Sequence, residues 1–304
     1  MLRYIGKRLL LMVPVIVGIS FILFTIMDLT PGDPARMLLG EFASQEEVNA
    51  LREEMGLNEN FFVRYGNYVL DALHGDFGTS YRTNARCVDE IRNRFPSTLT
   101  IAAFAMLLSA AVGIPVGVIS AVKQYSLIDI CSMVSALMLT SVPAFWLGLM
   151  MILLFSLRLG WLPSVGSSTW KHFLMPSAAL AASQMATLIR MTRSTMLEVV
   201  RQDYIRTAKA KGTSQIGIIF KHAMRNTMLP VITVIGINFG LLLGGALIIE
   251  NVFGVSGLGT LMVTSVKSKD APMLIASVLF ASTIGGLVNL LVDILYAYID
   301  PRVK

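Results

Sequence analysis

Six long stretches of this sequence contain no aspartate, glutamate, lysine or arginine. They cover residues 9–27, 95–122, 130–157, 172–189, 226–249 and 271–292. A helix of about 20 residues spans the ~30 Å hydrocarbon core of a bilayer, and each stretch approaches or exceeds that length. A helix also satisfies its own backbone hydrogen bonds, which lipid cannot do. The pattern therefore predicts an all-α membrane protein with six transmembrane helices.

Two of the predicted spans are irregular. The fourth stretch is short and contains Ser183 and Gln184, which makes it the weakest of the six. The stretch 130–157 is long enough to hold a broken helix, and Pro143 is the expected break. The first stretch is too long for the apolar core of a signal peptide and no small-residue cleavage site follows it, so we expect a retained span.

The distribution of lysine and arginine predicts how these helices are oriented. An even number of spans places both ends of the chain on one side, and cytoplasmic segments carry an excess of positive charge. With the ends inside, inner segments hold 14 of the 25 basic residues, including Arg302 and Lys304 and eight residues in 190–225. Short outer loops hold 4, and the other 7 lie in the segment 28–97, whose length exempts it from the rule. We expect both termini to be cytoplasmic.

The segment after the first span has the pattern of a folded cap. Ser44 and Glu47 have the spacing of a helix capping box, Val48 begins an apolar face, and Gly56 is placed to end that helix. A second helix is expected near 60–73. The predicted parts of the chain are a first helix at 1–29, an extracytoplasmic loop domain at 30–97 and a five-helix core at 98–304.

Composition agrees with a membrane location. The chain of 304 residues is 55% hydrophobic and 14% charged, too little charge to cover the surface of a soluble domain. The net charge of +6 is largely the topology signal, and no basic face of a soluble module indicates nucleic-acid binding. The two cysteines, Cys87 and Cys131, fall near opposite sides of the bilayer, so we expect both to be free thiols.

Motifs that would indicate an enzyme occur without the context they need. GDFGTS (75–80) contains the Asp-Phe-Gly of kinases but no other kinase element, and GVSGLG (254–259) lacks the strand and spacing of a dinucleotide loop. We expect the latter to form a turn or a short re-entrant element. The sequence has no P-loop, and His74, His172 and His222 are isolated from one another. We expect no catalytic site, metal or cofactor.

Polar and small residues within the spans leave two interpretations open. Gln184, Asn238 and Asn289 could line a solute pathway or bond neighbouring helices. Glycines and prolines, as in VGIPVGV, are either ordinary enrichment in membrane helices or hinges and close helix contacts. The middles of the spans carry no charged side chain, which disfavours a proton-coupled carrier, since such carriers commonly keep an intramembrane carboxylate.

The stretch DYIRTAKAKG (203–212) lies in the basic segment 190–225. On a helix, Tyr204, Ala208 and Gly212 would stack at i, i+4 and i+8, and their small members would let another backbone approach closely. One interpretation is a positive loop that only fixes topology. A segment of 36 residues with helical order instead favours a docking surface for a cytoplasmic partner.

Together with HAMRNTMLP (222–230), this stretch resembles the cytoplasmic coupling loop of ABC importer permeases, in the dipeptide/oligopeptide/nickel subgroup. The generic pattern is Glu-Ala-Ala, three residues, Gly and a later Leu-Pro. Ala208 and Gly212 match it, whereas Arg206 and Thr207 stand where Glu and Ala would be. The Leu-Pro pair also lies further downstream. The subgroup shares these departures.

Four more motifs extend the resemblance over nearly the whole chain: PGDPA (31–35), GDFGTS, MTRSTMLEV (191–199) and ENVFGVSGLG (250–259). The resemblance implies a type I importer permease fold in the bacterial inner membrane, without an ATPase site of its own. It also implies three kinds of partner: a second permease subunit in a heterodimer, two cytoplasmic ATPase subunits, and an extracytoplasmic solute-binding protein.

The resemblance further implies that the stretch 203–212 couples ATP hydrolysis to movement of the spans. The residues that match the motif and are expected to form the coupling surface are Asp203, Tyr204, Arg206, Thr207, Ala208, Ala210, Lys211 and Gly212. The solute stays open among dipeptides, oligopeptides, glutathione and nickel complexes. A stand-alone secondary carrier is the alternative of another class.

Overall fold

Helices make up nearly all of the regular structure. The computed structural model describes residues 2–30, 32–40 and 42–299, and within them an isolated β-bridge joins Thr79 to Arg86. The α-helices are α1 Leu2–Leu29, α2 Pro34–Leu39, α3 Gln45–Glu54, α4 Phe61–Leu73, α5 Cys87–Val122, α6 Leu127–Ser141, α7 Ala144–Met151, α8 Leu174–Val200, α9 Asp203–Ala210, α10 Gln215–Gly217, α11 Met224–Gly245, α12 Leu247–Val252, α13 Leu258–Lys267 and α14 Ala271–Ile299. Three further segments are helices wound more tightly or more widely than an α-helix. They are η1 Ile152–Arg158, η2 Trp170–Phe173 and η3 Ile218–Ala223.

Four helices of the described chain are long and apolar enough to cross a membrane. They are Ile5–Leu29, Cys87–Val122, Gln215–Gly244 and Ala271–Ile294. A fifth candidate is the pair Leu127–Ser141 and Ala144–Arg158, which bends by 94°. The break falls at Val142 and Pro143, so the predicted break at Pro143 is confirmed.

Helix α8, the expected fourth span, has 27 residues but a more polar surface. It contacts α5, α6, α7 and α11. A helix enclosed in this way meets protein rather than lipid over much of its surface, so it does not need an apolar side chain at every position. The count of six spans stays a prediction.

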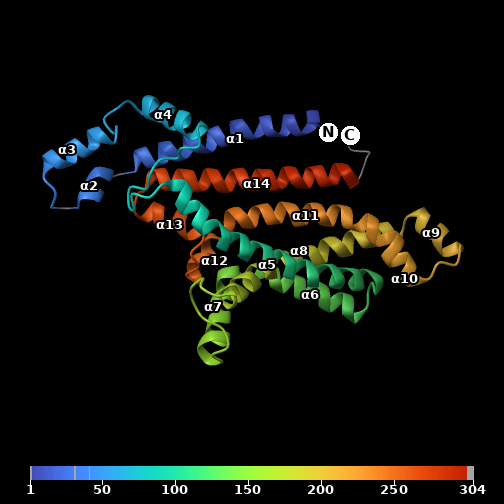
Figure 1. Ribbon diagram of the computed structural model, residues 1–304. Helices are drawn as coiled ribbons and strands as arrows, with labels where there is room; N and C mark the ends of the chain where they lie inside the picture. The colour runs from blue at the N-terminus through green and yellow to red at the C-terminus, as the bar shows by residue number, and fades with distance from the viewer. Residues whose placement is uncertain (1, 31, 41, 300–304) are drawn as a thin grey trace.

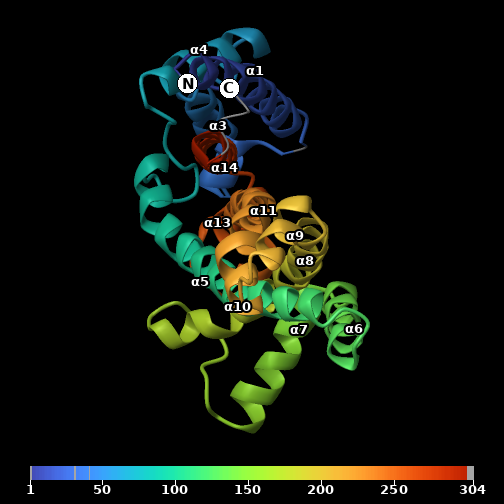
Figure 2. The same ribbon diagram turned by 90° about the vertical axis from the view of Figure 1, so that its right-hand side faces the viewer.

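The long helices form a layered bundle with two distinct ends. In Figure 1, α1 lies beside α14, followed by α11 and then by α5 and α8, with α6 and α7 at the far edge, and Figure 2 shows the same order. The start of α1 and the end of α14 lie at the same end as α9 and α10, which we call the α9 end. Helices α2, α3 and α13 lie at the opposite cap end. Pro31, Arg302 and Lys304 lie outside the described residues.

Small residues let α5 and α8 approach each other closely. A Cβ atom added at Gly113 would lie 2.9 Å from the Leu188 Cβ atom, and one at Gly117 would lie 2.7 Å from the Thr192 Cβ atom and 2.8 Å from the Ile189 carbonyl oxygen. These glycines form the Gly-x-x-x-Gly pattern that permits backbone contact between membrane helices. Of the interpretations left open for VGIPVGV, this pair supports close helix contact.

Serine hydroxyls reinforce the same interface. The Ser177 hydroxyl donates to the Ile101 carbonyl oxygen at 3.3 Å, and the Ser109 hydroxyl lies 3.0 Å from the Ala181 carbonyl oxygen. Both serines are buried, so these bonds satisfy polar groups that lipid could not.

The cap forms as its capping signals predict. Ser44 accepts a hydrogen bond from the Glu47 N–H, and the Glu47 carboxylate accepts one from the Ser44 N–H at 2.9 Å, which confirms the capping box. The Ser44 hydroxyl also donates to the Glu47 carboxylate at 2.8 Å, and this bond together with that from the Ser44 N–H lowers the pKa of Glu47 below its usual value. Helix α4 confirms the second helix near 60–73, and its Tyr65 packs edge-on against Phe21 of α1, with ring centroids 5.3 Å apart.

Helices extend past the ends of the apolar stretches. Helix α5 begins at Cys87, so the proposed domain boundary at 97/98 lies inside a helix. Helix α8 continues to Val200, and α10, η3 and α11 form a continuous helical run that begins at Gln215, so the segment 190–225 is not one loop. The physical reason is that a helix needs backbone hydrogen bonds rather than apolar side chains, and it continues into water past the first charged residue.

Replacing Gly117 by alanine should loosen the bundle, because the new methyl group would overlap Thr192 and the Ile189 carbonyl group. Overpacking of this kind costs about 1–3 kcal/mol. The matched control is Gly18→Ala in α1, where no atom lies within 4 Å of the added carbon. We expect a lower melting temperature for purified Gly117→Ala than for Gly18→Ala, and equal values would contradict the close contact.

Candidate functional site

Helix α9 is a short helix that one apolar side chain fixes to the bundle. Ile205 is fully buried in a cluster that includes Val118 of α5 and Met196 of α8. Burial of one isoleucine stabilises by roughly 1.5–3 kcal/mol. The Tyr204 hydroxyl adds a polar contact, accepting a hydrogen bond from the Asn226 amide at 2.6 Å. The helix is therefore packed directly onto α5 and α8.

Gly212 ends this helix in a Schellman motif. Its φ is +79°, its N–H donates to the Lys209 carbonyl oxygen at 3.0 Å, and the Thr213 N–H donates to the Ala208 carbonyl oxygen at 3.2 Å. The predicted stacking of Gly212 with Tyr204 and Ala208 on one helical face is therefore wrong. Because Gly212 has left-handed backbone angles, the chain leaves the helix axis there and Gly212 does not join that face.

The outward face of α9 is exposed and mostly polar. The side chains of Asp203 and Arg206 are 96% and 78% exposed and lie 3.7 Å apart. Ala208 is half-buried. Further exposed residues of the stretch are Tyr204, Thr207, Lys209, Ala210, Lys211 and Gly212. The structure thus brings the predicted coupling residues together on one small surface, with Ala208 at its inner edge.

Two apolar residues beside α9 were missed by the sequence analysis. Ile216 and Phe220 are 71% and 66% exposed on the segment formed by α10 and η3, which packs against α9. Their i, i+4 spacing, offset from the buried Ile218, is the signal that identifies an outward apolar face. The exposed surface is therefore basic on α9 and apolar beside it.

A bidentate ion pair joins α6 to α8 on the same side of the bundle. Arg193 Nε and Nη2 donate to the two Asp129 carboxylate oxygens at 2.6 and 2.8 Å. The Ser120 hydroxyl and the Tyr125 N–H also donate to Asp129, whose side chain is 5% exposed. The turn between α5 and α6 is thereby fixed to α8. Arg193 lies in MTRSTMLEV, but nothing in that stretch of sequence identifies it as the partner of Asp129.

At the cap end, a buried carboxylate caps α13 from outside that helix. Glu250 accepts hydrogen bonds from the Thr98 hydroxyl at 2.6 Å and the Thr260 N–H at 3.1 Å, while Thr98 accepts one from the Leu258 N–H at 2.8 Å. Helix starts leave such N–H groups without intrahelical partners. A Cβ atom at Gly257 would lie 2.4 Å from the Glu250 carboxyl carbon. ENVFGVSGLG is therefore a capping motif, and GVSGLG covers the end of the connection between α12 and α13 and the first two residues of α13.

The motif GDFGTS makes a comparable attachment. Asp270, which is buried, accepts hydrogen bonds from the Ser80 hydroxyl and from the Tyr81 N–H at 3.0 Å. Two further donors are the Met273 N–H in the first turn of α14, at 3.4 Å, and the Arg82 N–H, at 3.5 Å. The loop that precedes α5 is thereby tied to the start of α14.

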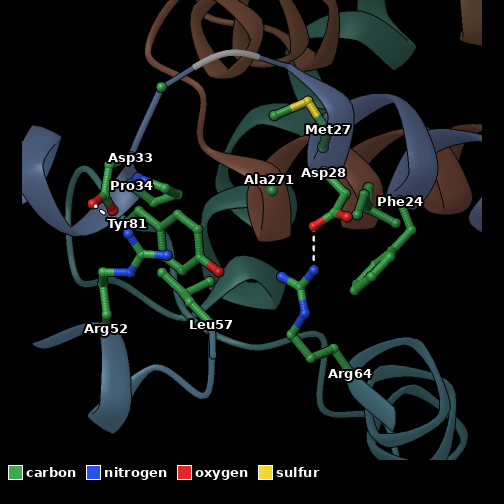
Figure 3. A pocket seen from close by; sticks show the side chains of 12 residues that line it. Phe24, Met27, Asp28, Asp33, Pro34, Arg52, Leu57, Arg64, Tyr81 and Ala271 are labelled. Atoms are coloured by element: carbon green, nitrogen blue, oxygen red, sulfur yellow. Dashed lines mark hydrogen bonds and ion pairs between the residues drawn. The ribbon is translucent and has the colours of Figure 1, made fainter. Parts of the chain in front are cut away.

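A charged pocket of about 440 Å³ lies where the cap meets the bundle (Figure 3). Arg52 pairs with Asp33 at 3.2 Å, and Arg64 of α4 pairs with Asp28 at the end of α1. Figure 3 shows Tyr81 between the two pairs. Partly exposed ion pairs contribute about 0–1 kcal/mol each, so they orient the cap more than they stabilise it.

Known proteins share this architecture. The sequence profile of the binding-protein-dependent transport system inner membrane component matches residues 113–304. The profile for the N-terminal part of such membrane components matches residues 1–102. The chain belongs to this family. It is a permease of the ABC importer type, as the motifs around 203–212 predict.

Individual relatives cover the whole permease. It is 42% identical over 332 aligned residues to the dipeptide transport system permease protein DppB of Alkalihalophilus pseudofirmus, with 100% of both chains covered. It is 40% identical over 304 residues to the glutathione transport system permease protein GsiC of Escherichia coli strain K12, covering 100% of this chain and 99% of the relative. Its fold resembles a chain of the MetNI methionine ABC transporter in inward facing conformations, with a TM-score of 0.59 and 16% identity over 69% of this chain and 96% of that one. The predicted permease fold is confirmed.

The three amides within the permease spans lie in different surroundings. Gln184 and Asn238 are half-buried, whereas Asn289 is exposed in a hollow of about 310 Å³ between α1 and α14. The ion pair of Arg8 and Asp293, 2.9 Å long, lines the same hollow. Within the described chain, the hydrogen bonds found include none made by these amides. Their role, in a solute pathway or in bonding between helices, stays a prediction.

Among the described residues, no group of three or more His, Cys, Asp or Glu side chains is placed to hold a metal ion. Cys87 is buried and Cys131 is exposed, and both are free thiols.

Replacing Arg193 by methionine should destabilise the permease, because it leaves the Asp129 carboxylate buried without its cation. Removing one partner of a buried pair costs roughly 3–5 kcal/mol, and we expect the lower end because the Arg193 side chain is 21% exposed. The control is the double variant Asp129→Asn/Arg193→Met, which removes both charges and should regain part of the loss. Melting temperatures of the purified variants measure this, and an unchanged value for Arg193→Met would contradict it.

Proposed function

We propose that this permease is one of two membrane subunits that form a translocation pathway for di- and oligopeptides. ATP hydrolysis on separate subunits drives the transport, and this chain carries no ATPase site. The observation that supports the solute class is the full-length relationship to a dipeptide permease. Glutathione is itself a tripeptide, so the similarity to a glutathione permease supports the same class.

The coupling surface is the exposed face of α9 together with the apolar residues beside it. It comprises Asp203, Tyr204, Arg206, Thr207, Ala208, Ala210, Lys211, Gly212, Ile216 and Phe220. An ATPase subunit that binds this surface can displace α9. Because Ile205 packs against α5 and α8, and Arg193 joins α8 to α6, a displacement of α9 is transmitted to three of the long helices. The pathway then opens alternately to the two sides of the membrane.

The proposed transporter has two further features of topology and three further kinds of partner. Six spans cross the inner membrane with both termini cytoplasmic, a second permease completes a heterodimer, and two ATPase subunits dock on the α9 end. A solute-binding protein docks on the cap end, where α2, α3 and α4 form a folded surface. The parts 1–29, 30–97 and 98–304 serve as first span, cap and permease core.

Gln184, Asn238 and Asn289 are the proposed polar residues of the pathway. Gln184 and Asn238 are half-buried and Asn289 is exposed, so a second permease or a solute could reach each of them. A raised KM for peptide uptake in Gln184→Ala, with an unchanged melting temperature, would support this role, and unchanged kinetics would exclude it.

Two alternatives differ in the solute or in the energy source. The same transporter type could carry glutathione or nickel complexes, and competition of each with peptide uptake separates these solutes. A stand-alone secondary carrier would move solute without ATPases. Dipeptide flux into vesicles that contain only this chain would favour the carrier, whereas flux that needs all subunits and ATP supports the proposal.

Replacing Phe220 by aspartate, or Arg206 by glutamate, should abolish uptake without unfolding the permease, because both side chains are exposed. An apolar anchor at an interface contributes ~2 kcal/mol or more, so ATPase affinity should fall about 30-fold in Phe220→Asp. The loss in Arg206→Glu should depend on salt, since exposed charges are screened within about 8 Å at physiological ionic strength. Co-purification of the ATPases and peptide uptake measure the effect.

The control for this experiment is Lys171→Glu, a charge reversal at an exposed residue outside the coupling surface. It should leave assembly and uptake intact. Normal ATPase association and uptake in both coupling variants would show that α9 and its neighbours only anchor the topology.

The orientation can be read by thiol labelling in a Cys131→Ser background. Asn49→Cys in α3 should react with an impermeant maleimide added to sealed cells, and Lys209→Cys in α9 should react only after the membrane is opened, since the two helices lie at opposite ends of the bundle. Labelling of position 209 from outside would reverse the proposed topology.

A further inference from the structure

An apolar pocket of about 720 Å³ lies between α1, α4, α5 and α14. Its walls are valine, leucine, isoleucine and phenylalanine side chains, such as Val13 and Val17 of α1, Phe95 of α5 and Phe280 of α14. Its volume falls in the range of about 300–1,000 Å³ that is usual for small-molecule sites. It shares no lining residue with the charged pocket of Figure 3.

The pocket opens on the outside of the bundle. Val13, Val17 and Leu73 line it, yet 56%, 44% and 77% of their surfaces are exposed. Two of its walls, α1 and α14, and a third, α5, are helices long and apolar enough to cross a membrane. Whatever enters the pocket therefore enters from the bilayer side of the protein.

Two polar groups at this pocket have no partner within the described chain. Arg92 is exposed, and its side chain makes no ion pair or hydrogen bond with the described residues, because the nearby Glu90 is already paired with Arg94 at 3.3 Å. The Tyr68 hydroxyl is buried without a hydrogen-bond partner. A cation at the rim can bind an anion, and an unsatisfied hydroxyl in the wall can bind an ester oxygen. Together they favour a ligand that carries such a group beside an apolar body.

We infer that this pocket is a phospholipid site, in which an acyl chain fills the space between α1 and α5 and the phosphate binds Arg92. A polar solute would find almost no hydrogen-bonding group in these walls. A helix of another subunit would need small residues at the contact, and these walls carry mostly large side chains. An amphiphile with an anionic head matches both the apolar body of the pocket and the cation at its rim. The bound lipid completes the wall that α4 leaves open between α1 and α5.

The test uses the assembled transporter in vesicles that contain a phosphatidylglycerol with a diazirine in its acyl chain. After irradiation, adducts should concentrate on the pocket segments of α1, α5 and α14. Ala72→Trp fills the pocket from α4, and Arg92→Gln removes the cation. We expect Arg92→Gln to reduce adducts at these segments about fivefold, the factor for one basic contact to a lipid headgroup, and Ala72→Trp to reduce them at least as much by occupying the space.

Two controls separate a bound lipid from ordinary contact with the bilayer. Arg82→Gln removes an exposed arginine that does not line the pocket, and it should change nothing. Labelling near Leu107, 66% exposed on α5, reports bulk lipid and should be equal in all variants. Adducts spread evenly over exposed apolar residues, or unaffected by Ala72→Trp and Arg92→Gln, would overturn the site.

The occupant is identified by a benzophenone attached to Leu73→Cys in the Cys131→Ser background. Leu73 lines the pocket and is exposed, so its reporter should form an adduct with phospholipid. An adduct with a peptide of the second permease would show that a protein segment occupies the space and would overturn the proposal. Neither result depends on which solute is transported.

Discussion

The close approach of α5 and α8 is the contact on which the bundle depends. Gly113 and Gly117 bring the two backbones together, and buried serine hydroxyls bond across the same interface. Lipid tails are as apolar as leucine, so helices in a membrane gain little from burying apolar surface against each other and need close packing and hydrogen bonds instead. Helix α8, enclosed by α5, α6, α7 and α11, can therefore carry a polar surface within the permease.

Charged residues in this permease gather at the ends of the bundle and act on backbone groups and turns. Glu250 and Asp270 satisfy N–H groups at the starts of α13 and α14, and Asp129 receives Arg193 at the turn between α5 and α6. In the middle of the bundle, helices approach each other closely at small residues, as at Gly240, where an added Cβ would lie 3.4 Å from the Gly285 carbonyl oxygen. Fixed ends and a closely packed middle suit helices that move as units. Helix α9 is attached to this arrangement by the buried side chain of Ile205.

Much of the architecture was predictable because it follows from local rules. Runs without charge predict membrane helices, Pro143 predicts the break before α7, and the Ser44 and Glu47 pair predicts the start of α3. Helix ends were less predictable. The charge-free rule ended spans at the first charged residue, whereas α5 and α8 continue past it because their backbone hydrogen bonds do not depend on side-chain polarity.

The sequence by itself determined the membrane class, the helical cap and the family, since composition, capping pairs and the motifs around 203–212 are local features that need no partner in space. Only the tertiary structure decided which residues meet. The pairing of Asp129 with Arg193, the capping of α13 by Glu250, and the placement of Ile216 and Phe220 beside α9 join positions whose contact depends on how helices cross. The left-handed turn at Gly212 likewise sets where α9 stops. Helix crossing is governed by side-chain fit summed over whole interfaces, and no short stretch of sequence contains that sum.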